Sequence, residues 1–181
     1  FFFFFFWFFF CFLLFFVFVV FGFVVLGFVL CGFLGWLGFV GYLFAFSLCC
    51  FVGRADFLAP CEALHGGLGA VQKGNVVVLV SRGGKTAELL PVLDVSIKKG
   101  ATVIGVTENM DSPIAKQSDI VLPMHIEKES DKYNMQATSS YIATIALFDA
   151  LICAVMEETD YKKEQFALIH PGGAVGERLN K

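Results

Sequence analysis

The sequence predicts an α/β protein with three layers, in which helices cover both faces of a doubly wound parallel sheet. From Gly53 onward, short continuous apolar runs alternate with helical patterns, and the connections between them are short. Continuous apolar runs are typical of strands buried on both faces, and strand–helix alternation produces a parallel sheet with helices on both sides. Ligands of such sheets bind beyond the carboxyl ends of the strands, so a functional site is expected there.

Three strands are expected in the second half of the chain. Each is a short apolar run, rich in β-branched residues and bounded by polar or turn residues: 75–81 (NVVVLVS), 102–107 (TVIGVT) and 119–122 (DIVL). Runs of this length and composition fit strands at the centre of an α/β sheet.

Helices are expected between and after these strands. The first, 86–98, ends at Gly100 and presents one apolar face, made of Leu89, Leu90, Leu93 and Ile97. Ser112 is an N-cap before Pro113, which opens a short helix through residue 116. The longest helical pattern is 135–158, and its apolar side consists of Ile142, Ile145, Ala146, Ile152, Cys153 and Met156.

Composition divides the chain into two unlike parts. Residues 1–53 contain no Asp, Glu, Lys, Arg or His and hold 21 of the 24 phenylalanines. Every formal charge lies in residues 54–181, and the net charge of −3 offers no basic surface to nucleic acid. The six cysteines form no C-x-x-C pair and the three histidines lie far apart. We therefore expect reduced, buried thiols, as in a cytosolic protein, and no metal site.

Hydropathy alone predicts one long or two short membrane spans in residues 1–51. The opening FFFFFFWFFF is low-complexity, however, and no basic residue flanks the segment to orient a span. Glycines at 32, 35, 38 and 41 favour a loop and the start of a helix, with helix–helix packing as the other interpretation. We expect a cytoplasmic protein, and anchoring in a membrane through residues 1–52 is the alternative.

The loop at residues 81–86 (SRGGKT) carries the strongest local signal for a ligand. Gly83 and Gly84 let the backbone approach a ligand closely, and the N-terminus of the following helix favours an anion. The hydroxyls of Ser81 and Thr86 add donors, so the loop suits a phosphate monoester. The other interpretation is a plain strand-to-helix turn capped by Thr86. The loop is neither a Walker motif nor a dinucleotide-binding fingerprint.

Three further residues have ordinary explanations when each is taken singly. His170, in the rigid segment HPGGA, could be a surface or structural residue. Glu129 could be a solvated loop charge. Glu88 lies in the first turn of the expected helix, where the helix dipole favours a carboxylate in any case.

Taken together, the motifs resemble those of the arabinose-5-phosphate isomerases of the KpsF/GutQ type, within the sugar isomerase (SIS) superfamily. They are P-x-E-A-L-H-G-G-L-G at 60–69, S-x-x-G-x-T at 81–86, D-S-P-I-A at 111–115, T-S-S at 138–140, D-A-L at 149–151 and H-P-G-G-A-V-G at 170–176. Their order and spacing match over residues 54–181, and the H-P-G-G-A-x-G segment is highly specific to this group.

The resemblance implies a SIS domain, flavodoxin-like or Rossmann-like in topology, over residues 26–181, preceded by a Phe-rich segment at 1–25. It implies that ribulose 5-phosphate and arabinose 5-phosphate are interconverted without a cofactor, in a homotetramer whose active sites are shared between subunits. The catalytic residues that it implies are His170, contributed by a neighbouring subunit, Glu88 and Glu129. The implied substrate-binding residues are His65, Ser81, Gly83, Gly84, Thr86, Ser139 and Ser140. An enediol reaction needs a base near neutrality, and imidazole, with a pKa of roughly 6.5, fits that need.

The sequence also departs from the family pattern. Gly83 stands where the loop usually has a second serine, and residues 26–53 resemble the family's opening βα unit with its polar residues replaced. In that unit Trp36 takes the place of a catalytic lysine and Leu37 that of a phosphate-binding serine. Loss of one positioned electrostatic group costs on the order of 10²–10³ in rate. A non-catalytic phosphosugar-binding module is therefore the alternative function, and we expect no pair of CBS regulatory modules.

Overall fold

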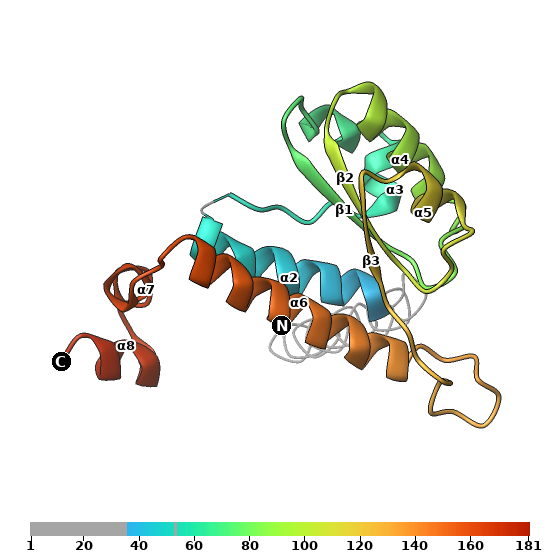
Figure 1. Cartoon of the computed structure of the whole chain (residues 1–181). Helices are drawn as coiled ribbons and strands as arrows, with labels where there is room; N and C mark the ends of the chain where they lie inside the picture. Colours follow the sequence, from blue (N-terminus) through green and yellow to red (C-terminus); the bar gives the residue numbers. More distant parts are fainter. Residues whose placement is uncertain (1–35, 53) are drawn as a thin grey trace, which may run out of the picture. The chain divides into compact units, whose positions relative to one another are not determined.

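The computed structural model describes residues 36–52 and 54–181. The chain divides into two units, Phe1–Trp36 and Leu37–Lys181, and all described residues except Trp36 belong to the second. Its elements, in chain order, are α2 (Trp36–Val52), α3 (Pro60–Leu64), the 3₁₀ helix η1 (Gly67–Ala70), β1 (Val76–Val80), α4 (Leu89–Lys98), β2 (Thr102–Thr107), α5 (Pro113–Gln117), β3 (Ile120–Pro123), α6 (Ser139–Glu158), α7 (Lys163–Ile169) and α8 (Gly173–Leu179) (Figure 1). The Phe-rich segment at 1–25 and residues 26–35 of the expected opening βα unit lie outside the described residues.

The three predicted strands are confirmed and form one parallel sheet in the order β1-β2-β3. The predicted bounds differ from the observed ones by at most one residue at either end. The register places Val78 beside Ile104 and Ile104 beside Ile120. Parallel strands of this kind require a crossover between them, and α4 and α5 supply the two crossovers.

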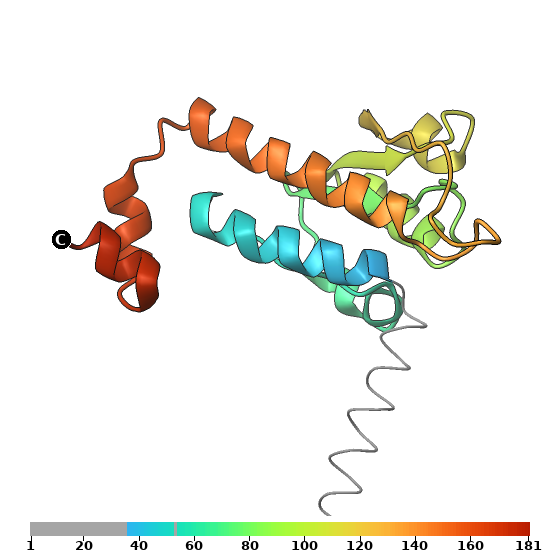
Figure 2. The ribbon, with the colours of Figure 1, turned by 90° about the horizontal axis from the view of Figure 1, so that it is seen from below.

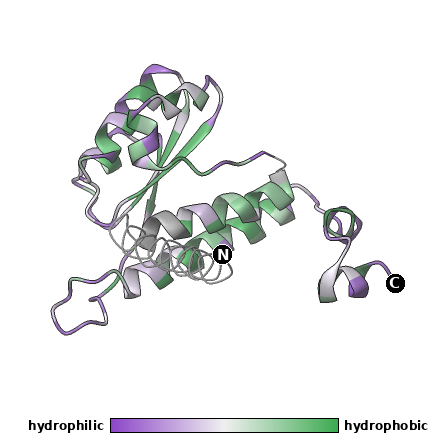
Figure 3. Cartoon of the chain, turned by 180° about the vertical axis from the view of Figure 1, so that it is seen from behind, coloured by the Kyte–Doolittle hydropathy of each residue, from purple (hydrophilic) through white to green (hydrophobic). Residues whose placement is uncertain are grey.

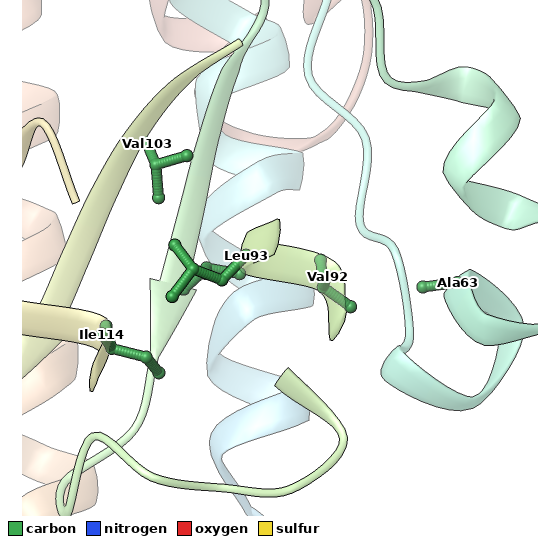
Figure 4. Packing of buried hydrophobic residues seen from close by; sticks show 6 residues of the cluster. Ala63, Val92, Leu93, Val103 and Ile114 are labelled. Atoms are coloured by element: carbon green, nitrogen blue, oxygen red, sulfur yellow. The ribbon is translucent and has the colours of Figure 1, made fainter. Parts of the chain in front are cut away.

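One face of the sheet packs against the helices α3, α4 and α5. Alternate strand residues point to opposite faces, and Leu79 and Val103 point to this one. They form a core with four buried helix residues, Ala63, Val92, Leu93 and Ile114 (Figure 4). Val103 and Ile114 are fully buried. This cluster is the first of two cores.

The opposite face packs against α2 and α6, which lie side by side (Figures 1 and 2). Val106 is the fully buried strand residue of this second core, which also contains Met124. The rings of Phe44 in α2 and Phe148 in α6 stack with their centroids 3.9 Å apart. Helices thus cover both faces of the sheet, and the predicted three-layer α/β fold is confirmed.

The start and the buried face of α4 differ from the prediction. Residues 86–88 form a turn, closed by a hydrogen bond from Leu89 N to Thr86 O, and the helix begins only at Leu89. Val92, Leu93 and Ser96 form its buried face, whereas Ile97 is 42% exposed. The prediction was therefore wrong for Ile97, because a small serine rather than an isoleucine lies against the sheet. Ser96 Oγ is buried and has no hydrogen-bond partner among the described residues.

The buried side of α6 is also more polar than predicted. The helix begins at Ser139, and Ser140, Thr144 and Phe148 are its buried residues. Thr144 Oγ1 donates a hydrogen bond to Ser140 O at 2.7 Å, so its burial leaves no unpaired hydroxyl. Of the predicted apolar residues, Ile145, Ile152 and Met156 are half-buried, but Ile142, Ala146 and Cys153 are exposed.

Among the described residues, α6 alone is long and apolar enough to cross a membrane. Its buried residues line the second core, as in a helix that packs against a sheet.

The short helix α5 follows the prediction closely. Ser112 Oγ accepts a hydrogen bond from Ala115 N at 3.2 Å and caps the helix, and Pro113 occupies its first position. The helix continues to Gln117, one residue beyond the expected end.

The expectation for the cysteines was half right. The four described cysteines are free, but Cys49, Cys61 and Cys153 are exposed and Cys50 is half-buried, so they are not the buried thiols that were expected. The other two cysteines lie outside the described residues.

Candidate functional site

The predicted phosphate loop connects β1 to α4 and lies beyond the carboxyl end of β1. Ser81 Oγ and Thr86 Oγ1 lie 2.8 Å apart, so the structure brings the two predicted hydroxyls together. The N–H of Gly84 donates to both the carbonyl and the hydroxyl oxygen of Ser81, each at 3.0 Å. These bonds draw residues 81–86 into a compact turn.

The two glycines of the loop have different structural roles. Gly84 has a φ of +64°, and a Cβ at this position would lie 2.0 Å from Ser112 Oγ and 2.8 Å from Thr107 Oγ1. A side chain is thus excluded there by backbone conformation and by close packing. Gly83 has open space around the position of a Cβ, with only Lys85 Cγ at 4.0 Å. The loop therefore needs the glycine at 84 and tolerates a larger residue at 83.

Several backbone donors of the loop are unused. The N–H groups of Lys85, Thr86 and Ala87 donate no hydrogen bond within the described part of the chain. Successive free N–H groups form a concave site suited to an anion. Thr86 does not cap the helix, because its hydroxyl bonds to Ser81 and Glu88 is the residue before the helix. The binding of an anion by this loop stays a prediction.

A charged cluster crosses the carboxyl edge of the sheet beside this loop. Arg82, which follows β1, donates from Nε to Glu108 Oε2 at 2.7 Å and from a terminal nitrogen to Glu129 Oε1 at 3.0 Å. Glu108 follows β2, and its other oxygen lies 3.2 Å from Nδ1 of His125, which follows β3. The hydrogen bond between Arg82 and Glu108 raises the pKa of the arginine and lowers that of the glutamate. One ionisable side chain after each strand thus contributes to the cluster.

Glu129 is the most enclosed member of the cluster, with 3% of its side chain exposed. Burial alone would raise its pKa, but hydrogen bonds from Ser140 and Thr138 outweigh that effect and lower the pKa from 4.5 to about 2. The donors to Oε2 are Thr138 N at 2.8 Å, Thr138 Oγ1 at 3.0 Å and Ser140 N at 3.2 Å. An ionised carboxylate with so low a pKa is a weak proton acceptor near neutrality and a strong anchor for cations and N–H groups.

The two predicted serines of α6 lie beside this carboxylate. Ser140 is 1% exposed and gives its N–H to Glu129, while Ser139 Oγ lies 3.0 Å from Ser130 Oγ. Glu129 bonds on its other side to Arg82. The structure therefore links the start of α6 to the loop at 81–86 through the ion pair between Arg82 and the buried Glu129.

Glu88 and His65 are not connected to this network. Glu88 is exposed, precedes the first turn of α4 rather than lying in it, and makes no side-chain hydrogen bond among the described residues. His65 is the exposed C-cap residue of α3 and likewise has no side-chain hydrogen bond or ion pair within the described chain. Their predicted roles stay predictions.

His170 lies far from the loop within one chain. It follows α7, its ring stacks on that of Phe166 at a centroid distance of 3.9 Å, and Nδ1 lies 2.9 Å from Phe166 O. α7 follows the C-terminal end of α6, whereas Ser140 and Glu129 lie at the N-terminal end (Figure 1). A helix of 20 residues is about 30 Å long. Contact between His170 and the loop would require a second copy of the chain.

The remaining expectations concern metals and Trp36. The described residues contain no group of three or more His, Cys, Asp or Glu side chains that could hold a metal ion. Trp36 is the first residue of α2, and its side chain lies outside the described part of the structure.

Sequence reasoning missed Arg82, Glu108 and His125. Each follows the end of a strand by one or two residues, where an α/β sheet binds its ligands. That position is the signal by which they could have been found.

Comparison with known proteins gives consistent matches. Residues 43–154 match the SIS domain family. The chain is 38% identical over 146 residues to arabinose 5-phosphate isomerase KdsD of Pseudomonas aeruginosa and 34% identical over 146 residues to KpsF of Escherichia coli. These alignments cover 81% of this chain but 45% and 46% of the relatives. The chain therefore spans about half the length of the curated relatives that it matches.

Two solved structures are similar in both sequence and fold. A protein of Listeria monocytogenes, assigned provisionally as a sugar-phosphate isomerase, is 46% identical with a TM-score of 0.70, and the match covers 74% of this chain and 72% of that one. A protein of Escherichia coli CFT073 in complex with arabinose 5-phosphate is 29% identical with a TM-score of 0.72, covering 76% and 73%.

Proposed function

Because the chain belongs to the SIS domain family, we propose that it is an aldose–ketose isomerase of a sugar phosphate, with ribulose 5-phosphate and arabinose 5-phosphate as the substrate pair. The observation that carries the proposal is the loop beyond β1, where the hydroxyls of Ser81 and Thr86 meet beside three unused backbone N–H groups. Hydroxyls and free N–H groups in a turn between a strand and a helix suit a phosphate monoester. The 38% identity to an arabinose 5-phosphate isomerase supports the choice of sugar.

In the proposed reaction the loop binds the phosphate and the imidazole of His170 moves a proton between C1 and C2. The base removes the proton from C2 of the aldose while O1 is protonated, which gives an enediol. The proton is then returned to C1 while O2 loses its proton, which gives the ketose. Imidazole suits both steps because its ordinary pKa lies near neutrality. Glu129, held ionised, acts in this scheme as a positioning residue that fixes Arg82 and the start of α6.

We propose that the active form is a homo-oligomer, and a tetramer is the expected state. Two features support assembly. First, His170 and the loop lie at opposite ends of α6. Second, α2 and α6 are hydrophobic along much of their length (Figure 3), and Tyr42, Phe46 and Ile142 are 52%, 64% and 66% exposed. Burial of such side chains between copies would stabilise an oligomer.

The second candidate is a non-catalytic phosphosugar-binding module. It is favoured by Trp36 and Gly83, which stand where the family pattern has a lysine and a serine. The phosphate loop would serve this function equally well. The two candidates differ in whether carbon-bound hydrogen exchanges with solvent.

The decisive test is isomerisation of a panel of pentose and hexose phosphates in deuterated water, with deuterium incorporation read by mass spectrometry. We expect incorporation into arabinose 5-phosphate with the wild-type chain and none above background with His170→Ala, which should still bind the sugar phosphate. Binding without incorporation by the wild-type chain would establish the binding module. Incorporation at the wild-type rate by His170→Ala would remove the histidine from the reaction.

We propose a cytoplasmic location, with anchoring through residues 1–52 as the alternative. Separation of soluble and membrane fractions after high-salt and carbonate washes tests it. We expect the protein in the soluble fraction as a single oligomer on a sizing column. Retention in the washed membranes would favour the anchored form.

A further inference from the structure

We propose that the ammonium group of Lys85 binds the phosphate of the substrate and is the cation that gives this site its affinity. The inference rests on the proposed function, because it assumes that a sugar phosphate occupies the loop. It assigns a ligand contact to the residue between Gly84 and Thr86, which is a variable position of the S-x-x-G-x-T motif.

Without Lys85, the charged side chains around Arg82 do not favour an anion. Arg82 belongs to the loop itself, but its guanidinium is hydrogen-bonded to both Glu108 and Glu129. One positive and two negative groups leave that cluster with a net charge of −1, from the three side chains just named. A phosphate monoester carries a charge of about −1.5 to −2 at neutral pH. The charge of Arg82 is therefore already balanced by carboxylates, and these three side chains together would repel the ligand.

Lys85 itself is unpaired. Its side chain is exposed and has no hydrogen bond or ion pair among the described residues. It therefore keeps its full charge available to a ligand. Lys98 and Lys116, by contrast, are ion-paired to Asp94 and Asp111.

The side chain of Lys85 also lies close to the rest of the loop. Lys85 Cγ is 4.0 Å from the position that a Cβ on Gly83 would occupy, so the stem lies beside Gly83 within the loop. The same residue contributes one of the three unused N–H groups, together with Thr86 and Ala87. A flexible four-carbon stem lets the ammonium follow an anion that is bound to those N–H groups.

The ordinary alternative is a solvated surface lysine, and the chain contains a matched example of one. Lys73 is also exposed and has no partner among the described residues. It lies in the turn before β1, near Gly100, at the amino edge of the sheet and so opposite the phosphate loop. Lys73→Met removes the same charge from the protein without touching the proposed site.

The test compares binding of arabinose 5-phosphate, by calorimetry, to the full wild-type chain and to Lys85→Met, Lys85→Arg and Lys73→Met. We expect Lys85→Met to bind about tenfold to hundredfold more weakly, as for loss of one charged hydrogen bond. Lys73→Met should bind within about twofold of wild type, and Lys85→Arg should keep most of the affinity. Inorganic phosphate should compete with the sugar phosphate in the wild-type chain, and the salt dependence of binding should be shallower in Lys85→Met.

Three outcomes would overturn the inference. Equal binding by wild type and Lys85→Met would remove Lys85 and leave the proposed function standing. Equal weakening by Lys85→Met and Lys73→Met would mean that only the overall charge of the protein matters. If the wild-type chain binds neither arabinose 5-phosphate nor inorganic phosphate, the proposed function fails together with the inference. Thermal unfolding and sizing of each variant exclude misfolding as the cause.

Discussion

At the carboxyl edge of the sheet, contacts between distant parts of the chain hold the site residues in place, whereas His170 in the C-terminal segment is held only by a residue close to it in sequence. At that edge Glu129 is 3% exposed and receives hydrogen bonds from Arg82, Thr138 and Ser140 of the same chain. His170 is fixed by one short-range hydrogen bond and by stacking on Phe166, only four residues earlier. One half of the proposed site is therefore built by the fold of a single chain. In the proposed function, the other half acts only when copies of the chain assemble.

The largest expected effect is in subunit complementation, which tests whether the two halves of the site come from different copies of the chain. His170→Ala removes the proposed base, and loss of general acid–base catalysis costs about 10²–10⁴ in rate. Thr86→Val removes a proposed phosphate ligand. Neither variant alone should be active, but co-expression of the two chains should restore activity at about a quarter of the sites if each site combines two copies in a symmetric oligomer. Activity is measured by deuterium incorporation, and absence of any restoration would show that both halves come from one chain.

Substitution of the two loop glycines provides a second test, in which the free energy of unfolding is measured. Gly84→Ala places a Cβ 2.0 Å from Ser112 Oγ at a residue with φ of +64°. We expect a loss of about 3 kcal/mol or more in the free energy of unfolding, from backbone strain and overpacking together. Gly83→Ala meets open space, so its free energy of unfolding should stay within about 1 kcal/mol of wild type. Equal effects, measured by urea denaturation, would mean that the loop does not hold this conformation.

Acid sensitivity distinguishes the buried carboxylate from its exposed neighbours. The pKa of Glu129 is about 2 in the folded chain against an ordinary value of 4.5. Because the folded pKa is the lower one, the stabilisation is fully present above pH 4.5 and is lost as the pH falls towards 2. The difference corresponds to roughly 3 kcal/mol.

The measurement is the urea midpoint at a series of pH values. Glu129→Gln should lack this part of the pH dependence, while Glu127→Gln, an exposed carboxylate of the same loop, should retain it. If the urea midpoint of Glu129→Gln fell with pH as much as that of the wild-type chain, the acid sensitivity would belong to other groups.

The smallest expected change in the free energy of unfolding comes from a substitution in α4, which covers the face of the sheet away from α2 and α6. Ser96 Oγ is buried without a hydrogen-bond partner among the described residues. Replacement of an unsatisfied buried hydroxyl by a methyl group removes its desolvation cost, so Ser96→Ala should raise the free energy of unfolding by about 1 kcal/mol. Ser140→Ala is the matched comparison, since Ser140 lies in the hydrogen-bonded region around Glu129. It should destabilise the chain. Destabilisation by Ser96→Ala would indicate that this hydroxyl has a partner after all.

The strands could be predicted from sequence to within one residue, because continuous β-branched runs between turn residues are buried on both faces. The start of α4 could not. The residues at 86–88 are compatible with a helix, but the bond between Ser81 and Thr86 and the conformation of Gly84 keep them in a turn. The buried stripe of α6 was missed because Ser140 and Thr144 occupy it, with hydroxyls that a hydropathy pattern counts as exposed.

The site was predicted in part. The pairing of Ser81 with Thr86 follows from the local motif, since the two residues are five positions apart. Arg82 pairs with Glu108, which is 26 positions later in the sequence, and with Glu129, which is 47 positions later. No local sequence pattern indicates such partners. Only the fold brings them together.

The contact between His170 and the last turn of α7 determines which tautomer the imidazole adopts. A carbonyl oxygen can only accept, so in the neutral ring the nitrogen that faces Phe166 O must carry the hydrogen. The lone pair then resides on Nε2, which is directed away from that carbonyl. Backbone geometry thus selects, in the neutral ring, the tautomer whose Nε2 can accept a proton.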